Sequence, residues 1–130
     1  MNVMATHKIL MALSTLPHLK GLKAVAPIII SQESFIFEYI ADGANLIEQI
    51  TEFQPDLILL DYLLEKMDCI DAIQVIRQLP KYSTIPILVT SYRVFTADMV
   101  MECIEAGASD ILFDPANPKE VLNSFLKALT

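Results

Sequence analysis

Two patterns of hydrophobic and polar residues alternate along this chain. Short runs of consecutive apolar residues predict buried strands over residues 7–13, 35–43, 56–61, 83–91 and 110–113. Between these runs, apolar residues recur three or four positions apart, which predicts a helix beginning at Ser14 or Thr15 and further helices over 44–53, 70–79, 97–107 and 117–129. Strand and helix therefore alternate throughout, and this order predicts an α/β fold with a mostly parallel sheet and helices on both faces.

The predicted helix ends carry recognisable stop and start residues. Thr96 is expected to cap the helix over 97–107, and Gly107 is a natural C-terminal stop. Asn117 is expected to cap the last helix, with Pro118 in the first helical position. Pro27 interrupts the first helix, which we expect to kink or to stop just before it.

Asp61 ends the apolar run PDLILLD. A buried carboxylate without partners is costly, so its position raises the question of what it does there. In open parallel sheets, ligands bind beyond the carboxyl ends of the strands. Asp61, Ser91 and Asp114 all fall at such predicted ends. We therefore expect Asp61 to be exposed at the rim of the sheet and not buried within it.

Composition and charge narrow the class of protein. We interpret residues 1–130 as one domain with a core over about 7–129, and attribute the 54% of apolar residues to strands buried on both faces. No apolar run is long enough to cross a membrane, and the N-terminal residues do not resemble a secretory signal. The net charge of −7 argues against a nucleic-acid partner. Cys69 and Cys103 are interpreted as reduced thiols of a cytoplasmic protein.

Several short motifs occur in one order and spacing: ADG, PDLILLD followed by MD, IPILVTS and GASDILFDP. Together they resemble the receiver domain of bacterial response regulators, and the resemblance covers nearly the whole chain. It implies a flavodoxin-like fold of five parallel strands in the order 2-1-3-4-5. It also implies phosphoryl transfer from a histidine kinase or a small phosphodonor to Asp61, whose carboxylate would act as the nucleophile.

The resemblance also implies functional positions that this chain only partly keeps. Asp61 occupies the acceptor position, and Ser91 the position that contacts a phosphoryl oxygen. Leu13 and Ser14 stand where the family has two acids that bind Mg²⁺, and Asp114 stands where it has a Lys. Asp61 is thus left as a weak Mg²⁺ ligand, since Mg²⁺ usually needs several oxygen ligands. Asp114 is interpreted either as a cap of the next turn or as a second carboxylate of a remodelled cation site.

Two further positions differ from the family pattern. Ile111 replaces an aromatic residue whose rotation accompanies activation, and Tyr92 replaces a small residue after Ser91. Tyr92 either shields Asp61 or is an exposed anchor for a partner. The face formed by residues 97–107, 110–113 and 117–129 is the predicted interface, for a signalling protein or for a second copy of the chain.

Three functions are compatible with this sequence. The first is a receiver domain in a two-component phosphorelay, with Asp61 as acceptor. The second is a pseudo-receiver that binds proteins without being phosphorylated. The third is an enzyme of another class, but phosphatases of the haloacid-dehalogenase type require a second Asp where this chain has Leu63. We therefore expect a signalling domain and not an enzyme.

Overall fold

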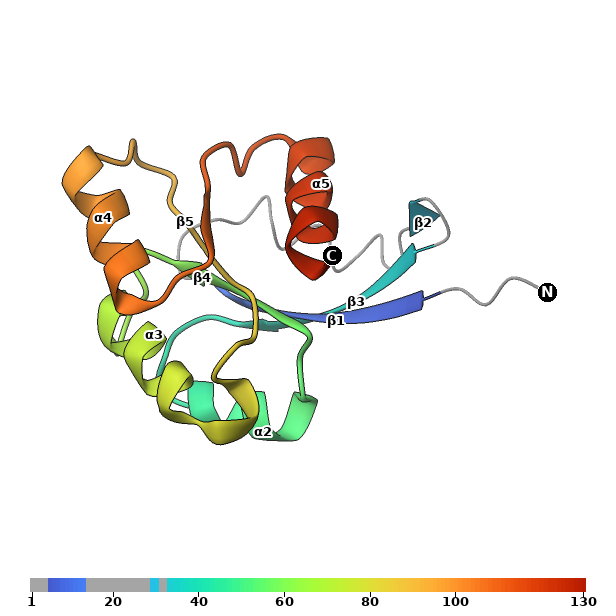
Figure 1. Ribbon diagram of the computed structural model, residues 1–130, viewed down its shortest axis with the longest axis horizontal. Helices are drawn as coiled ribbons and strands as arrows, with labels where there is room; N and C mark the ends of the chain where they lie inside the picture. Colours follow the sequence, from blue (N-terminus) through green and yellow to red (C-terminus); the bar gives the residue numbers. More distant parts are fainter. Residues whose placement is uncertain (1–4, 14–28, 31–32) are drawn as a thin grey trace.

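A computed structural model describes residues 5–13, 29–30 and 33–130 of the chain. These residues form one sheet in the order β2-β3-β1-β4-β5-β6 (Figure 1). The strands are β1 (Ala5–Ala12), β2 (Ile29–Ile30), β3 (Glu33–Ile40), β4 (Leu57–Asp61), β5 (Ile87–Thr90) and β6 (Asp110–Leu112). All neighbours pair in parallel except the short β2, which is antiparallel to β3 at the edge. Without β2, the order is the predicted 2-1-3-4-5, which is confirmed.

The helices that the structure describes are α2 (Leu46–Phe53), α3 (Cys69–Gln78), α4 (Ala97–Ala106), α5 (Pro118–Leu129) and the short 3-10 helix η1 (Pro80–Tyr82). The helix expected after Ser14, with its interruption at Pro27, lies outside the described residues. The strand expected from Ser83 begins only at Ile87, because η1 and the turn after it take up the preceding residues. No helix in the described ranges has the length and apolar character needed to cross a membrane.

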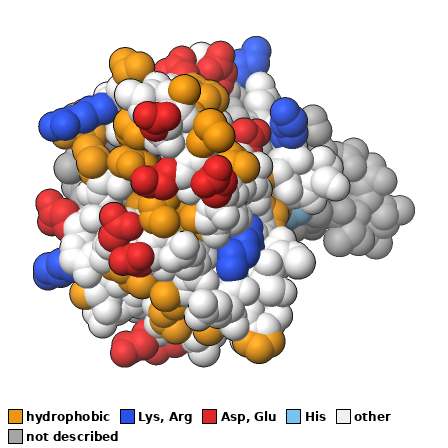
Figure 2. Space-filling view, turned by 60° about the vertical axis from the view of Figure 1, so that its left-hand side comes forward, with side chains coloured by type: hydrophobic (Ala, Val, Ile, Leu, Met, Phe, Trp, Pro, Cys, Tyr) orange, Lys and Arg blue, Asp and Glu red, His pale blue; other side chains and the backbone are white. Residues whose placement is uncertain are grey.

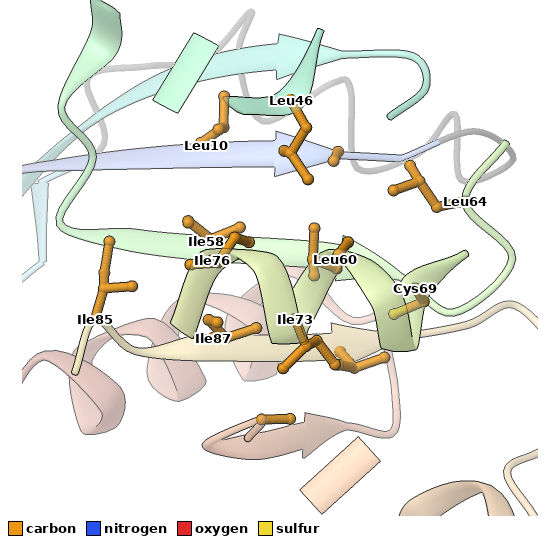
Figure 3. Close-up of a cluster of buried hydrophobic side chains, with 14 of the residues drawn as sticks. Leu10, Leu46, Ile58, Leu60, Leu64, Cys69, Ile73, Ile76, Ile85 and Ile87 are labelled. Carbon is orange, nitrogen blue, oxygen red and sulfur yellow. The ribbon is translucent and has the colours of Figure 1, made fainter. Parts of the chain in front are cut away.

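Apolar side chains fill both faces of the sheet. Alternate strand residues pack against α2, α3 and α4 on one face and against α5 on the other. Figure 3 shows the first layer, in which Ile76 of α3 lies beside Ile58 of β4, and Ile73 lies toward Ile87 of β5. Every residue of β4 is buried, so the apolar run that ends in Asp61 is explained by helices covering both faces.

The predicted helix ends are confirmed at α4 and α5. Thr96 precedes α4, and its hydroxyl oxygen accepts a hydrogen bond from the Met99 N–H at 3.1 Å. Gly107 follows α4 with a φ of 121°, a conformation that favours glycine. Asn117 precedes α5 and accepts from two N–H groups of its first turn.

Arg77 of α3 connects three segments near the amino ends of β5 and β6. Its guanidinium donates to the carbonyl oxygens of Ile85 at 2.7 Å, Gly107 at 2.9 Å and Tyr82 at 3.3 Å, and to the Ser109 hydroxyl at 3.4 Å. Carbonyl groups that follow a helix or precede a strand need such partners. Arg77 therefore holds the end of α4 next to the segments that lead into β5 and β6.

Candidate functional site

The candidate site lies at the edge of the sheet where the parallel strands end. Asp61 is the last residue of β4 and pairs in register with Thr90, the last residue of β5. Ser91 follows Thr90 directly, and Asp114 follows the end of β6 by two residues. The topology thus brings the three predicted site residues to one edge, where open α/β sheets bind ligands.

Asp61 is fully buried, so the expectation that it is exposed at the rim is wrong. The chain turns back directly after β4, and the Leu63 N–H donates to the Asp61 carboxylate at 2.9 Å. The Leu64 N–H donates to the Asp61 carbonyl oxygen at 3.0 Å, and the Leu64 side chain is itself buried. A hydrogen-bonded turn therefore offsets part of the cost of removing this carboxylate from water.

The loop after Asp61 is held against the turn between β3 and α2. The Gly43 N–H donates to the Glu65 carbonyl at 2.8 Å, and a Cβ atom on Gly43 would lie only 2.5 Å from the Met67 Cβ. Lys66 adopts a φ of 65°, and its ammonium lies 3.4 Å from the Asp42 carboxylate. The glycine of the ADG motif is thus required for the close approach of the loop that follows Asp61.

Ser91 and Asp114 line a hollow of about 270 Å³ between the β5–α4 and β6–α5 loops. Ser91 is buried, and its hydroxyl accepts a hydrogen bond from the Arg93 N–H at 3.1 Å. Asp114 is exposed, and its carbonyl accepts from the N–H of Asn117, whose side chain supplies the cap of α5. The residues lining the hollow are Ser91, Tyr92, Arg93, Val94, Phe113, Asp114, Pro115 and Ala116, and Asp61 is not one of them.

The other predicted positions lie apart from that hollow or at its rim. Leu13 is fully buried among the apolar residues that pack with α5, and Ser14 lies outside the described residues. Ile111 is buried in the layer that packs with α2, α3 and α4. Tyr92 is 51% exposed, with the Arg93 guanidinium 5.5 Å from its ring centre. Both interpretations of Tyr92 stay predictions.

The described residues do not offer a typical Mg²⁺ site. Within residues 5–13, 29–30 and 33–130, no group of three or more His, Cys, Asp or Glu side chains is placed to hold a metal ion. Mg²⁺ prefers near-octahedral oxygen ligands, and a lone buried carboxylate supplies few of them. The donor set described here therefore does not fit the metal that the receiver resemblance implies.

Both thiols are buried, and they pack on the same side of the sheet. Cys69 begins α3 and Cys103 lies in α4; each belongs to the apolar layer that those helices cover. Burial is the main cause that raises the pKa of both, to about 11 for Cys103, and each shift is increased by nearby acidic groups. Such thiols are unreactive at neutral pH, since the thiolate is the nucleophilic form.

A row of three aromatic side chains next to Asp61 was missed from the sequence. Tyr62 directly follows Asp61, and its ring meets Phe95 edge-on at 5.9 Å; Phe95 meets Phe113 in the same way at 5.9 Å. The Tyr62 hydroxyl donates to the Glu102 carboxylate of α4 at 3.0 Å. Burial, strengthened by Glu102, raises the pKa of Tyr62 to about 12. The sequence signal for this row was that Tyr62 and Phe113 directly follow the ends of β4 and β6.

The strand order, the covering helices and a carboxylate at the end of β4 define a receiver architecture. The response regulator receiver domain family matches residues 15–126, and the chain belongs to this family. The curated relatives include the DNA-binding response regulator MtrA of Mycobacterium tuberculosis H37Rv, 34% identical over 102 residues, which are 78% of this chain and 43% of MtrA. Chemotaxis protein CheY of Bacillus subtilis is 31% identical over 96 residues, 72% of this chain and 78% of CheY.

Solved structures agree on the fold. The chemotaxis response regulator CheY4 of Vibrio cholerae superposes with a TM-score of 0.79 at 19% identity, covering 96% of this chain and all of CheY4. The receiver domain of the response regulator merR from Colwellia psychrerythraea 34H gives a TM-score of 0.75 at 18% identity, over 95% of this chain and 97% of that domain. This chain spans less than half the length of the MtrA proteins it matches.

Proposed function

We propose that residues 1–130 form one receiver domain of two-component signalling that acts by binding a protein partner, with little or no phosphoryl transfer to Asp61. The observation that supports this most directly is the full burial of Asp61, whose carboxylate accepts a hydrogen bond from the Leu63 N–H. A nucleophilic carboxylate must reach the phosphorus atom in line with the leaving group. Asp61 has the position of an acceptor but lacks this access in the present conformation.

Charge supports the same proposal. A phosphoryl group beside Ser91 would share the hollow with the Asp114 carboxylate, where the family resemblance implies a Lys. Two unit charges about 4 Å apart interact by about 4 kcal/mol at an effective dielectric of 20, and by less in contact with water. A loss of only about 1.4 kcal/mol slows a reaction tenfold. Leu13, at the aligned acid position, is apolar and supplies no carboxylate to hold a compensating Mg²⁺. Among the residues that line the hollow, Arg93 is the one cation that can offset part of that repulsion.

Labelling with acetyl phosphate in the presence of Mg²⁺ tests the proposal. We expect the wild-type chain to label slowly or not at all, Asp61→Asn to be unlabelled, and Asp114→Lys alone to change little. Leu13→Asp and Ser14→Asp combined with Asp114→Lys should restore labelling at Asp61, because they return the charges that the reaction needs. Fast, Mg²⁺-dependent labelling of the unmodified chain at Asp61 would instead establish a working phosphoacceptor, with Asp114 as a metal ligand.

The proposed interface is the face formed by α4, β6 and α5. Met101 and Ile104 of α4 are 58% and 45% exposed, and Phe113 after β6 is 66% exposed. Figure 2, which turns the α4 side forward, shows hydrophobic side chains interspersed with Asp and Glu. We propose that a histidine kinase or another signalling protein binds there in the cytoplasm, and that the same face can pair two copies of the chain. Met101→Glu with Ile104→Glu should abolish either association in sedimentation velocity.

Nucleic acid is not a proposed partner. The chain carries 16 acidic residues against 9 Lys and Arg, whereas phosphate contacts require clustered basic side chains. Fluorescence anisotropy with labelled duplex DNA at physiological salt is expected to show no binding. Salt-sensitive binding at micromolar or lower Kd would contradict this part of the proposal.

A further inference from the structure

We propose that Tyr62 is a positioning residue that couples the turn at Asp61 to the exposed surface of α4 and the β6–α5 loop. Tyr62, Phe95 and Phe113 are called the aromatic row below. This role goes beyond the proposed function, because it concerns how a change at the Asp61 turn alters the surface of α4 and the β6–α5 loop. It does not depend on whether Asp61 accepts a phosphoryl group.

The inner end of the row is fixed to the acceptor turn. The Tyr62 N–H donates to the Thr90 carbonyl at 2.7 Å, which ties the residue to the end of β5. On its other side, the Leu63 N–H donates to the Asp61 carboxylate at 2.9 Å. The direction in which Tyr62 leaves the backbone therefore depends on a hydrogen bond that Asp61 itself accepts. Any change to that carboxylate changes the turn that carries Tyr62.

The outer end of the row reaches the surface at two places. The Tyr62 hydroxyl donates to Glu102, an exposed residue of α4, at 3.0 Å. Through Phe95, which is half-buried ahead of α4, the row ends at Phe113, which is 66% exposed. Edge-to-face rings at this separation have a preferred geometry, so a shift of one ring favours a matching shift of the next ring. A partner that covers Phe113 or moves α4 therefore acts on Tyr62.

The aromatic row offers a route that buried Ile111 does not. Ile111 is a buried aliphatic residue with few rotamers and no polar group, so it cannot report on Ser91 by hydrogen bonding. The Tyr62 phenol has a pKa raised to about 12, so it keeps its proton and remains a donor to Glu102. Coupling between two sites is reciprocal, so binding at the surface must change the Asp61 turn as much as the reverse.

NMR spectroscopy of the whole chain tests the inference. Asp61→Asn weakens the acceptor of the Leu63 N–H without adding a ligand, and is expected to shift the amide resonances of Glu102 and Phe113. In a Tyr62→Leu background the same substitution should no longer shift them. Tyr62→Phe keeps the ring contacts but loses the Glu102 bond, so only the Phe113 response should remain.

Matched variants separate coupling from folding. Tyr82→Phe removes another tyrosine hydroxyl, one that lies outside the aromatic row and donates to the Ile50 carbonyl at 3.3 Å. This variant should leave the transmitted shifts unchanged. Glu102→Gln keeps an acceptor oxygen and should preserve the amide shift that Asp61→Asn causes at position 102, whereas Glu102→Leu should remove that shift. If Tyr62→Leu does not fold, these two surface variants still test the coupling. The inference would be overturned by undiminished shifts at Glu102 and Phe113 in Tyr62→Leu, or by an undiminished shift at position 102 in Glu102→Leu. The absence of any shift from Asp61→Asn in the wild-type background would also overturn it.

Discussion

Removing the Arg77 guanidinium should destabilise the fold far more than removing an exposed cation. Arg77 makes two short hydrogen bonds, to the Ile85 carbonyl at 2.7 Å and to the Gly107 carbonyl at 2.9 Å. Its hydrogen bonds to the Tyr82 carbonyl at 3.3 Å and the Ser109 hydroxyl at 3.4 Å are longer and contribute less. A hydrogen bond with a charged partner contributes about 1.5 kcal/mol at the low end of its range. Arg77→Ala should therefore lower the free energy of unfolding by about 3 kcal/mol, two such bonds.

Urea unfolding followed by far-ultraviolet circular dichroism measures this difference, since the chain has no Trp. Arg77→Lys is expected to lose most of the same stability, because an ammonium cannot bridge both carbonyls as the planar guanidinium does. Lys119→Ala, at an exposed position in the first turn of α5, is the matched control and should stay within about 0.5 kcal/mol of the wild type. If Arg77→Ala unfolds at the same urea concentration as Lys119→Ala, the carbonyl bonds described here do not stabilise the fold.

Three further predictions concern the cap, the thiols and the strand ends. Asn117→Ala should lower the free energy of unfolding by about 1 kcal/mol through loss of the α5 cap, whereas Asn117→Asp should retain most of it in urea titrations. Folding raises the pKa of Cys69 and Cys103 above 9.0, so their contribution to stability is complete below that pH and is lost as the pH rises through the raised values, about 11 for Cys103 and higher for Cys69. Iodoacetamide should alkylate both thiols slowly at pH 7 until urea is added. A phosphoryl mimic such as beryllofluoride should cause little chemical-shift change around Ser91 and Ile111, and a large change centred on Ile111 would show this prediction wrong.

Local sequence accounts for the elements and their ends. Thr96 and Asn117 cap the helices that they precede, and Gly107 ends α4, because capping depends on residues within one turn of each other. The apolar run ending in Asp61 predicted a strand buried on both faces, and β4 is one. The same pattern gave no sign of β2, which has two residues, or of η1, which begins at Pro80 within a short connection.

At the candidate site, the sequence predicted at which strand ends the residues lie, but not which groups surround their side chains. The strand ends placed Asp61, Ser91 and Asp114 at one edge of the sheet, and the topology confirms that they share it. The exposure of Asp61 was predicted wrongly, since the burial of a strand end depends on the loops packed around it, and the loop after Asp61 contacts Gly43 of another connection. Nothing in the strand itself specifies that loop.

Sequence by itself therefore determined the alternation of strands and helices, their caps and the strand that carries Asp61, because these follow from periodicity and from contacts within a few residues. Only the tertiary structure decided that Asp61 is buried, that Ser91 and Asp114 line a hollow without it, and that Tyr62 meets Glu102, 40 residues further along the chain. The physical reason is that burial and side-chain pairing depend on which elements the crossovers bring together. Residues that far apart interact only after the parallel sheet has set the spacing between β4 and α4.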